Sequence, residues 1–342
     1  MSSAETLNNT ATANTVETYV DIRDLTVTFT GGRKPVKAVS GVNLKVKRGE
    51  VVALIGESGS GKSVTLRSIL RLHNPARSQI GGQVLVGGVD VVAMSEGKLS
   101  GFRGKVASMI FQEPLLALDP VYTVGEQIIE AILRHENISK SEARQRALSL
   151  FERVRIPSPE RRLDAYPHEM SGGMRQRAMI SLALASHPQL LLADEPTTAL
   201  DATVQIQILL LLRELQRELG LSVIFVTHDI GAAVEVADRI AVMYAGRIVE
   251  QGTTRTLLRA PRHPYTRALL KSLAHGSVAK GTRLETIPGS PPDLSNLSPG
   301  CSFADRCTLA QDACRVSVPE ITEISADHSA RCFRLDQTLT AI

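Results

Sequence analysis

Residues 56–63 have the spacing of a loop that binds phosphate. They read Gly-Glu-Ser-Gly-Ser-Gly-Lys-Ser, which fits the pattern G-x-x-x-x-G-K-[ST]. Glycines let the backbone curl so that successive N–H groups face phosphate oxygens. Lys62 supplies a positive charge for the β and γ phosphates, and the Ser63 hydroxyl can ligate Mg²⁺. The residues expected to bind nucleotide here are Gly56, Glu57, Ser58, Gly59, Ser60, Gly61, Lys62 and Ser63.

Two acids, Asp194 and Glu195, directly follow the apolar run 190–193. Buried acids are costly unless they pair or bind a metal. We expect Asp194 to hold Mg²⁺ and Glu195 to polarise the attacking water as a general base. His228 closes another apolar run, 223–227. A lone histidine after a strand is usually structural, but at a strand end beside the same site it could reach the γ-phosphate.

These groups can meet only if several strands end at one edge of a sheet. The pattern of strand 50–55, glycine-rich loop and helix 63–72 is the opening of a nucleotide-binding α/β domain. Short apolar runs later in the chain are typical of buried parallel strands. We therefore predict a layered α/β core. Its other expected strands are 19–29, 42–46, 84–92, 106–111, 190–193, 221–226 and 239–243.

Residues 123–186 have a mainly helical pattern. Helices are expected at 124–135 and 141–154, with Ser139 or Ser141 as a cap for the second. The most apolar segments, 179–185 and 206–212, are shorter than the roughly 20 residues that cross a bilayer, and we expect them to be buried helix.

Further motifs resemble those of ABC ATPases, in that family's order along the chain. The run Ser171-Gly172-Gly173-Met174-Arg175-Gln176 resembles the signature motif, and Ala199-Leu200-Asp201 resembles the D-loop. Gln112 matches the Q-loop glutamine that helps to bind Mg²⁺, His228 matches the switch histidine, and Phe29 falls where the family places an aromatic ring against adenine. The resemblance implies an ABC-type P-loop NTPase core at 19–275 with an inserted helical subdomain at about 114–186.

The signature motif is a second phosphate-binding surface. Ser171 can cap a helix whose Gly172 and Gly173 leave backbone N–H groups bare. The resemblance implies that two such domains pack head to tail, so that each signature, with Met174 and Asp201, completes the partner's ATP site. Met174 departs from the glutamine that most ABC proteins carry, which leaves the backbone donors unaffected and points to a subfamily.

Several segments are similar to dipeptide and oligopeptide importers, and to their "D" ATPase subunit in particular. They are 111–114, 118–120, 166–174, 263–266, 288–292 and 300–307. This resemblance implies an ATPase that powers peptide uptake from the cytoplasmic face of the inner membrane as a peripheral subunit. Its implied partners are two transmembrane permeases, which would lie near 113–121, a second and distinct ATPase chain, and an extracytoplasmic peptide-binding protein.

Other functions remain open at this point. Related importers of nickel, glutathione or heme use similar ATPases. A soluble ABC ATPase acting on nucleic acid or ribosomes is disfavoured, because the chain has one cassette, no sustained heptads and no basic stripe with interleaved aromatics. A net charge of +4 in 342 residues does not by itself indicate nucleic acid. A regulator that binds ATP without hydrolysis is disfavoured by Glu195 and His228.

The four cysteines all lie in the last 42 residues, as Cys301, Cys307, Cys314 and Cys332. Residues 1–18 look like a disordered leader without the apolar core of an export signal, so we expect a reducing compartment, where disulfides are rare. The spacing C-x5-C-x6-C-x17-C suggests one metal or cluster site. The family resemblance implies a [4Fe–4S] cluster in a C-terminal extension at 276–342. Zinc, with His328 as a substitute ligand, and free thiols are the alternatives.

Overall fold

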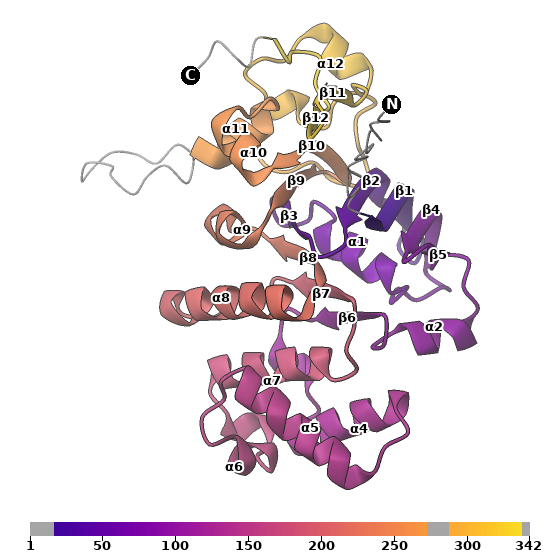
Figure 1. The fold of residues 1–342 in the computed structure, drawn as a ribbon. Coiled ribbons are helices and arrows are strands. Elements are labelled where there is room, and N and C mark those ends of the chain that lie inside the picture. The colour runs from indigo at the N-terminus through magenta and orange to yellow at the C-terminus, as the bar shows by residue number, and fades with distance from the viewer. Residues whose placement is uncertain (1–16, 272–286, 337–342) are drawn as a thin grey trace, which may run out of the picture.

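The computed structural model describes residues 17–271 and 287–336, and these ranges contain two sheets. The larger has the strand order β11-β12-β10-β9-β3-β8-β7-β6, and the smaller has the order β2-β1-β4-β5 (Figure 1). Residues 1–16 of the expected leader, residues 272–286 and the last six residues lie outside the described ranges, whereas Thr18, placed in the leader by the prediction, begins β1. The strands of the smaller sheet are β1 (Thr18–Phe29), β2 (Val36–Lys47), β4 (Ser78–Val86) and β5 (Val89–Asp90). Those of the larger are β3 (Val51–Ile55), β6 (Ala107–Ile110), β7 (Leu190–Asp194), β8 (Ser222–Thr227), β9 (Arg239–Tyr244), β10 (Arg247–Thr253), β11 (Thr322–Ser325) and β12 (His328–Ala330).

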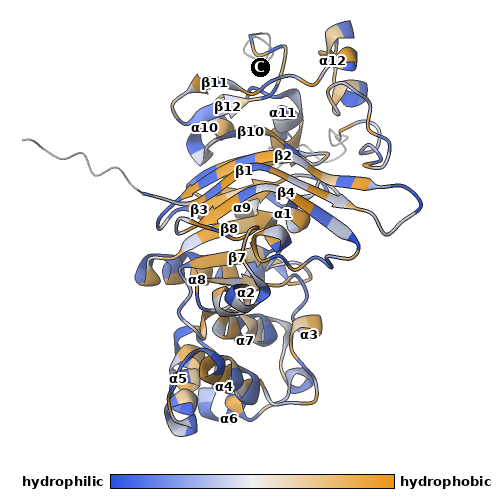
Figure 2. Cartoon of the chain, turned by 90° about the vertical axis from the view of Figure 1, so that its right-hand side faces the viewer, coloured by the Kyte–Doolittle hydropathy of each residue, from blue (hydrophilic) through white to orange (hydrophobic). Residues whose placement is uncertain are grey.

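The centre of the larger sheet is parallel, as the apolar runs predicted. Strands β6, β7, β8, β3 and β9 pair in parallel, and β3, β7 and β8 are buried along their whole length. Alternate side chains of a strand point to opposite faces. Val51, Ala53 and Ile55 therefore join the core beneath the helices, while Val52 and Leu54 join a second core toward the smaller sheet. Figure 2 shows the apolar strands at the centre of the molecule.

Helices surround this core. Those near the sheets are α1 (Lys62–Ile69), α2 (Glu96–Phe102), α8 (Ala202–Leu219), α9 (Ile230–Val236), α10 (Thr254–Arg259) and α11 (Pro264–Lys271). A separate group at one end of the molecule contains α3 (Pro114–Ala117), α4 (Val124–His135), α5 (Lys140–Arg153), α6 (Pro159–Leu163) and α7 (Gly172–Leu184) (Figure 1). Among the described helices, none combines the length and apolar character needed to cross a membrane.

The helices α4 and α5 begin at capping boxes. Thr123 and Ser139 each accept a hydrogen bond from the backbone N–H three residues on, and the carboxylates of Glu126 and Glu142 accept one from the backbone N–H of the cap residue. Such reciprocal bonds satisfy donors that the first helical turn leaves unpaired. The helix predicted at 124–135 is confirmed, and Ser139 rather than Ser141 is the cap of α5.

Three expectations about elements are wrong. The strand expected at 84–92 is two strands, because Gly87 and Gly88 both have positive φ and form a two-residue hairpin turn between Val86 and Val89. The helix expected at 63–72 ends at Ile69. The segment 206–212 is not wholly buried, since the side chains of Ile206 and Leu210 are about half exposed on one face of α8.

The C-terminal region adds strands to the larger sheet, which the sequence analysis did not predict. Strand β12 pairs antiparallel with β10, and β11 pairs with β12. Before this hairpin, residues 288–299 form an irregular stretch, followed by a 3₁₀ turn at Ala304–Arg306 and the short helix α12 (Asp312–Val316). The C-terminal hairpin of β11 and β12 therefore extends the edge of the larger sheet.

Candidate functional site

The predicted phosphate loop lies between β3 and α1, and its backbone requires glycine at two positions. Gly61 has φ +102°, and a Cβ there would lie 2.4 Å from the carbonyl oxygen of Ala38. Gly56 has φ +152°, and a Cβ would lie 2.2 Å from the carbonyl of Met243. Ser58 and Gly59 are exposed at the tip of the loop. Ser60 Oγ is buried without a hydrogen-bond partner among the described residues, which fits a loop shaped for a polar ligand.

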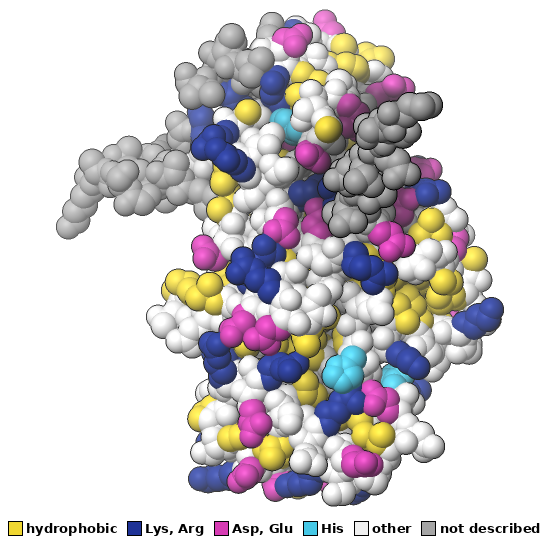
Figure 3. Space-filling model, in the orientation of Figure 1, with side chains coloured by type: hydrophobic (Ala, Val, Ile, Leu, Met, Phe, Trp, Pro, Cys, Tyr) yellow, Lys and Arg dark blue, Asp and Glu magenta, His cyan; other side chains and the backbone are white. Residues whose placement is uncertain are grey.

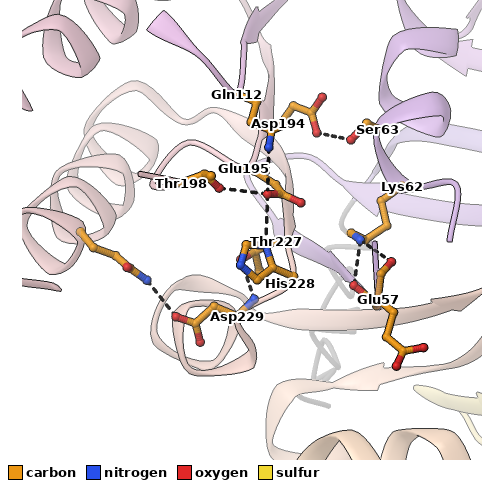
Figure 4. A network of polar contacts seen from close by, with 12 residues as sticks. Glu57, Lys62, Ser63, Gln112, Asp194, Glu195, Thr198, Thr227, His228 and Asp229 are labelled. Carbon is orange, nitrogen blue, oxygen red and sulfur yellow. Dashed lines mark hydrogen bonds and ion pairs between the residues drawn. The ribbon is translucent and has the colours of Figure 1, made fainter. Parts of the chain in front are cut away.

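Lys62 is buried and turned back on its own loop. Its Nζ donates hydrogen bonds to the carbonyl oxygens of Gly56 at 2.7 Å and Glu57 at 3.0 Å (Figure 4). Burial lowers the pKa of the Lys62 ammonium, and the negative charges of Glu195, Asp194 and Glu57 oppose that shift. The Lys62 ammonium therefore donates to two neutral carbonyl oxygens of the loop, and phosphate oxygens can replace these acceptors.

Asp194 ends β7 beside the start of α1, as the meeting of parallel strand ends predicted. It is fully buried, accepts a 2.6 Å hydrogen bond from Ser63 Oγ, and lies 3.4 Å from Arg67 Nη2. Burial raises the pKa of its carboxyl, while the Ser63 bond and the Arg67 charge lower it. A hydroxyl and a carboxylate side by side are the hard oxygen donors that Mg²⁺ prefers, so this pair fits the ion.

Glu195 joins three segments of the chain through one oxygen atom. Its Oε2 accepts hydrogen bonds from Thr198 Oγ1 at 2.9 Å and Gln112 Nε2 at 3.3 Å, and lies 3.1 Å from His228 Nδ1 (Figure 4). The side chain of Glu195 is 12% exposed and that of His228 is 56% exposed. The structure therefore brings together Gln112, Glu195 and His228, the three groups to which the sequence analysis gave catalytic roles.

The signature residues lie elsewhere. Ser171 caps α7 by accepting a hydrogen bond from the Met174 amide, as expected. A Cβ on Gly173 would lie 2.9 Å from a methyl group of Val204 on α8, and one on Gly172 would lie 3.6 Å from Leu200. Figures 1 and 2 both show α7 well apart from α1, on the other side of β6 and β7. The signature therefore does not face its own phosphate loop.

Two other residues that were predicted to contact nucleotide, Asp201 and Phe29, lie at the surface of the chain. Asp201 is exposed and caps α8 by accepting a hydrogen bond from Val204 N. Phe29 is half-buried at the end of β1, where its ring meets that of His73 edge-on at 5.4 Å. Neither touches Glu195 or Lys62 through a contact in the described structure.

The four cysteines line one small cavity, together with His263 and Phe303. None is in a disulfide. Burial raises the pKa of the Cys301 and Cys307 thiols and raises that of Cys332 to about 11, and the neighbouring cysteines add to these shifts. In residues 17–271 and 287–336, no three His, Cys, Asp or Glu side chains gather closely enough to hold a single metal ion.

The role of substitute zinc ligand expected for His328 is wrong. Its Nε2 lies 2.8 Å from Glu250 Oε1, in a buried pair that joins β12 to β10. His328 is not among the residues that line the cysteine cavity. The pairing of β12 with β10 directs the side chain to the sheet instead.

Sequence reasoning missed four residues of this site. Arg67 follows Ser63 by four positions on α1, a spacing that places both on one helix face and could have been recognised. Thr198 contacts Glu195 three residues away. Tyr265 and Arg306 reach Glu57 from distant parts of the chain, and no local pattern signals such contacts.

Two family models match the chain. The model "ABC transporter" matches residues 39–198, which include the phosphate loop, the signature, Asp194 and Glu195. The model "Oligopeptide/dipeptide transporter, C-terminal region" matches residues 249–314, which include three of the four cysteines.

Curated relatives match over most of the chain. A probable peptide ABC transporter ATP-binding protein of Sinorhizobium fredii is 48% identical over 94% of this chain and 96% of its own length. An oligopeptide transport ATP-binding protein, OppD, of Bacillus subtilis is 46% identical over 94% of this chain and 90% of its own.

A solved structure matches the cassette. The dimeric bacterial ABC transporter cassette MJ0796 superposes with a TM-score of 0.62 at 32% identity, covering 69% of this chain and 99% of that one. A second structure of the same cassette, described as a post-hydrolysis state bound to ADP and Pi, matches equally well.

Proposed function

This chain belongs to the ATP-binding proteins of ABC transporters, and from that premise we propose that it is the ATP-hydrolysing subunit of a peptide importer. The observation that carries the catalytic part is the convergence of Gln112, Thr198 and His228 on Glu195, next to the Ser63–Asp194 pair. A carboxylate in this place can orient and polarise a water molecule, while Lys62 binds the phosphates that the water attacks.

The roles of the remaining site residues follow from their positions. Ser63 and Asp194 would hold Mg²⁺, which when bound neutralises charge on the β and γ phosphates. Arg67 balances the negative charge of Asp194. Gln112 stands between Glu195 and the segment leading to α3 and α4, so a change at the γ-phosphate can move the helical group at 114–186.

A second cassette is required to complete the site. The signature on α7 lies apart from the phosphate loop of its own chain, yet its capped, glycine-bearing helix start presents bare N–H groups to an anion. We infer that Ser171, Gly172, Gly173 and Met174 bind the γ-phosphate held by a partner ATPase chain, with Asp201 at the same interface. A distinct second ATPase is the partner we favour.

The permeases would dock on the segment after Gln112. Large apolar side chains are exposed there, with Leu116 at 82% and Val121 at 72%, and a cavity lies between Phe111, Gln112 and Leu116. Exposed apolar patches commonly mark interaction sites. A coupling helix of a permease in this cavity would touch the same glutamine that contacts Glu195.

Peptides are the substrate class we propose, because relatives over nearly the full chain are named for peptide transport and the C-terminal model is that of oligopeptide and dipeptide transporters. Nickel, glutathione and heme remain the alternatives within related importers.

The chain would work peripherally at the cytoplasmic face of the inner membrane, and an extracytoplasmic peptide-binding protein would deliver the substrate. Nucleic acid is not a proposed partner, since basic and acidic side chains are interspersed on the face in Figure 3.

The assembly is tested by native purification of the subunit from detergent-solubilised membranes, with mass spectrometry of what accompanies it. We expect two permeases and a second ATPase chain, and a peptide-binding protein when substrate is present. Recovery with ribosomes or nucleic acid, without membrane proteins, would contradict the importer and favour a soluble ABC ATPase.

For the cysteines we propose an iron–sulfur cluster rather than zinc. All four cysteine side chains line one small cavity, which supports a group that they would bind together. Anaerobic purification should give a brown protein with visible absorption and about four iron atoms per chain, as a [4Fe–4S] cluster requires. A colourless, iron-free protein contradicts the cluster.

We further propose that the cassette spans 19–275 and the cysteine extension 276–342.

A further inference from the structure

Arg306, the residue before Cys307, reaches from the cysteine extension to the phosphate loop. Its Nη1 donates to Glu57 Oε2 at 2.7 Å, and its Nη2 donates to Glu57 Oε1 at 3.0 Å. Two parallel bonds of this kind are the strongest geometry that a guanidinium makes with a carboxylate. The two residues are 249 positions apart in the chain, so this contact joins the extension directly to the ATP site.

The surroundings of Arg306 are built for a guanidinium group. Besides the two bonds to Glu57, Nη1 donates to the Tyr244 hydroxyl at 3.1 Å, Nε to the Pro288 carbonyl at 2.8 Å, and Nη2 to the Ile287 carbonyl at 3.4 Å. All five N–H donors of the side chain are thereby used. The side chain is only 6% exposed, and the bonds to Glu57 and Tyr244 raise its pKa further, so the charge is permanent.

Glu57 is held at three points, and each affects the phosphate loop. Its amide donates to the Tyr265 hydroxyl at 2.8 Å, its carbonyl accepts from Lys62, and its carboxylate binds Arg306. Glu57 is the second residue of the loop, so its negative charge stands near the place where ATP must put its phosphates. Without a cation beside it, that charge would repel the nucleotide.

We propose that Arg306 is a positioning residue of the ATP site, through which the cysteine extension neutralises Glu57 and so sets the affinity for nucleotide. The inference rests on the proposed ATPase function. The extension thereby supplies the cation that pairs with the Glu57 carboxylate.

A double-mutant cycle of Arg306 and Glu57 tests this inference. The affinity for ATP is measured by calorimetric titration of the purified full chain. R306Q leaves Glu57 uncompensated, and we expect ATP to bind about tenfold more weakly, the order of effect of one charge near the phosphates at an effective dielectric constant of about 20. E57Q leaves Arg306 uncompensated, and we expect tighter binding. The double variant should return to within about threefold of the unmodified chain, because both charges are gone.

The matched control is R315Q, which removes an exposed arginine paired with Asp305 in the same extension and should leave affinity unchanged. A purely structural role for Arg306 would weaken binding in R306Q without rescue by E57Q. That outcome, or an unchanged affinity in R306Q, overturns the inference. If R306Q does not fold, the E57Q variant alone tests the inference. Unchanged or weaker ATP binding by E57Q would overturn it. An unmodified chain that binds no ATP would overturn the proposed function itself, and this inference with it.

Discussion

Just after β7, the carboxylate oxygen Glu195 Oε2 contacts three side chains, one from its own loop and two from other segments, and this has chemical consequences. Gln112, Thr198 and His228 fix the position of the group before any nucleotide binds. The backbone of Glu195 has φ +46°, a conformation that non-glycine residues adopt only under constraint. An orienting network around a base is the arrangement that places a water molecule for attack.

We predict that E195Q binds ATP with an affinity within about threefold of the unmodified chain but hydrolyses it at least about 100-fold more slowly, the usual contribution of a general base. Glutamine keeps the hydrogen-bonding shape and loses the basic oxygen. Steady-state phosphate release and calorimetric ATP titration measure the two effects. E130Q on the exposed face of α4 is the control. Near-normal turnover in E195Q would refute the role of base.

Lys62 should act on binding itself. We predict that K62A binds ATP roughly 10- to 100-fold more weakly, because one hydrogen bond to a charged group is worth about 1.5–3 kcal/mol. Fluorescent-nucleotide displacement gives the dissociation constant, and K45A, an exposed lysine of β2, serves for comparison. An unchanged constant would show that the buried ammonium never leaves the carbonyls of Gly56 and Glu57.

The sequence allowed some residue contacts to be predicted and not others. Ser63 was expected near Asp194 because the carboxyl ends of parallel strands meet at one edge of a sheet, and their 2.6 Å contact confirms it. The Arg306–Glu57 pair was not expected, because its partners come from segments whose relative placement depends on the whole fold.

Among the helices and strands, those with a long sequence pattern could be predicted, and those with a short or ambiguous pattern could not. Helix α4 was predicted with its bounds from the helical spacing of its residues, and the structure adds a capping box at Thr123 that supports the same start. Strand β12 has three residues, too few to show a period of two, and pairs with a strand far away in the chain. The Gly87-Gly88 turn carried a readable hairpin signal that the alternation of the flanking valines obscured.

The capping of α5 gives a prediction at this scale. S139A removes a hydroxyl that accepts from Glu142 N at 3.2 Å and donates to its carboxylate at 2.7 Å. We expect the free energy of unfolding to fall by about 1 kcal/mol. S141A, two positions along inside the same helix, is the matched control and should change it by less than about 0.5 kcal/mol. Urea unfolding followed by circular dichroism measures both, and equal effects would show that the cap is not the cause.

Over the whole molecule, the C-terminal extension is attached at two separated places. Arg306 binds the phosphate loop, and His328 binds Glu250 in the sheet, where Glu250 also accepts backbone hydrogen bonds from Arg262 at 2.6 Å and His263 at 2.9 Å. The Glu250 side chain is fully buried, so all of its partners are needed to offset the loss of water.

We predict that H328A lowers the free energy of unfolding by about 3 kcal/mol, since removing one partner of a buried pair leaves the other uncompensated. E323A, on the exposed strand β11 of the same hairpin, is the comparison and should have little effect. Denaturant unfolding of the full chain provides the measurement. A loss below about 1 kcal/mol in H328A would mean that the two backbone donors alone satisfy Glu250.

The pairing of β12 with β10 also has a consequence for synthesis on the ribosome. Until β12 emerges, the hydrogen-bonding edge of β10 has no partner from this hairpin, although the rest of the parallel sheet is already available to fold. At roughly 5–20 residues per second, the ribosome takes several seconds to add the chain between the two strands. An open strand edge invites pairing with other chains. A stop codon placed before β12 should therefore yield truncated cassettes that aggregate or recruit chaperones.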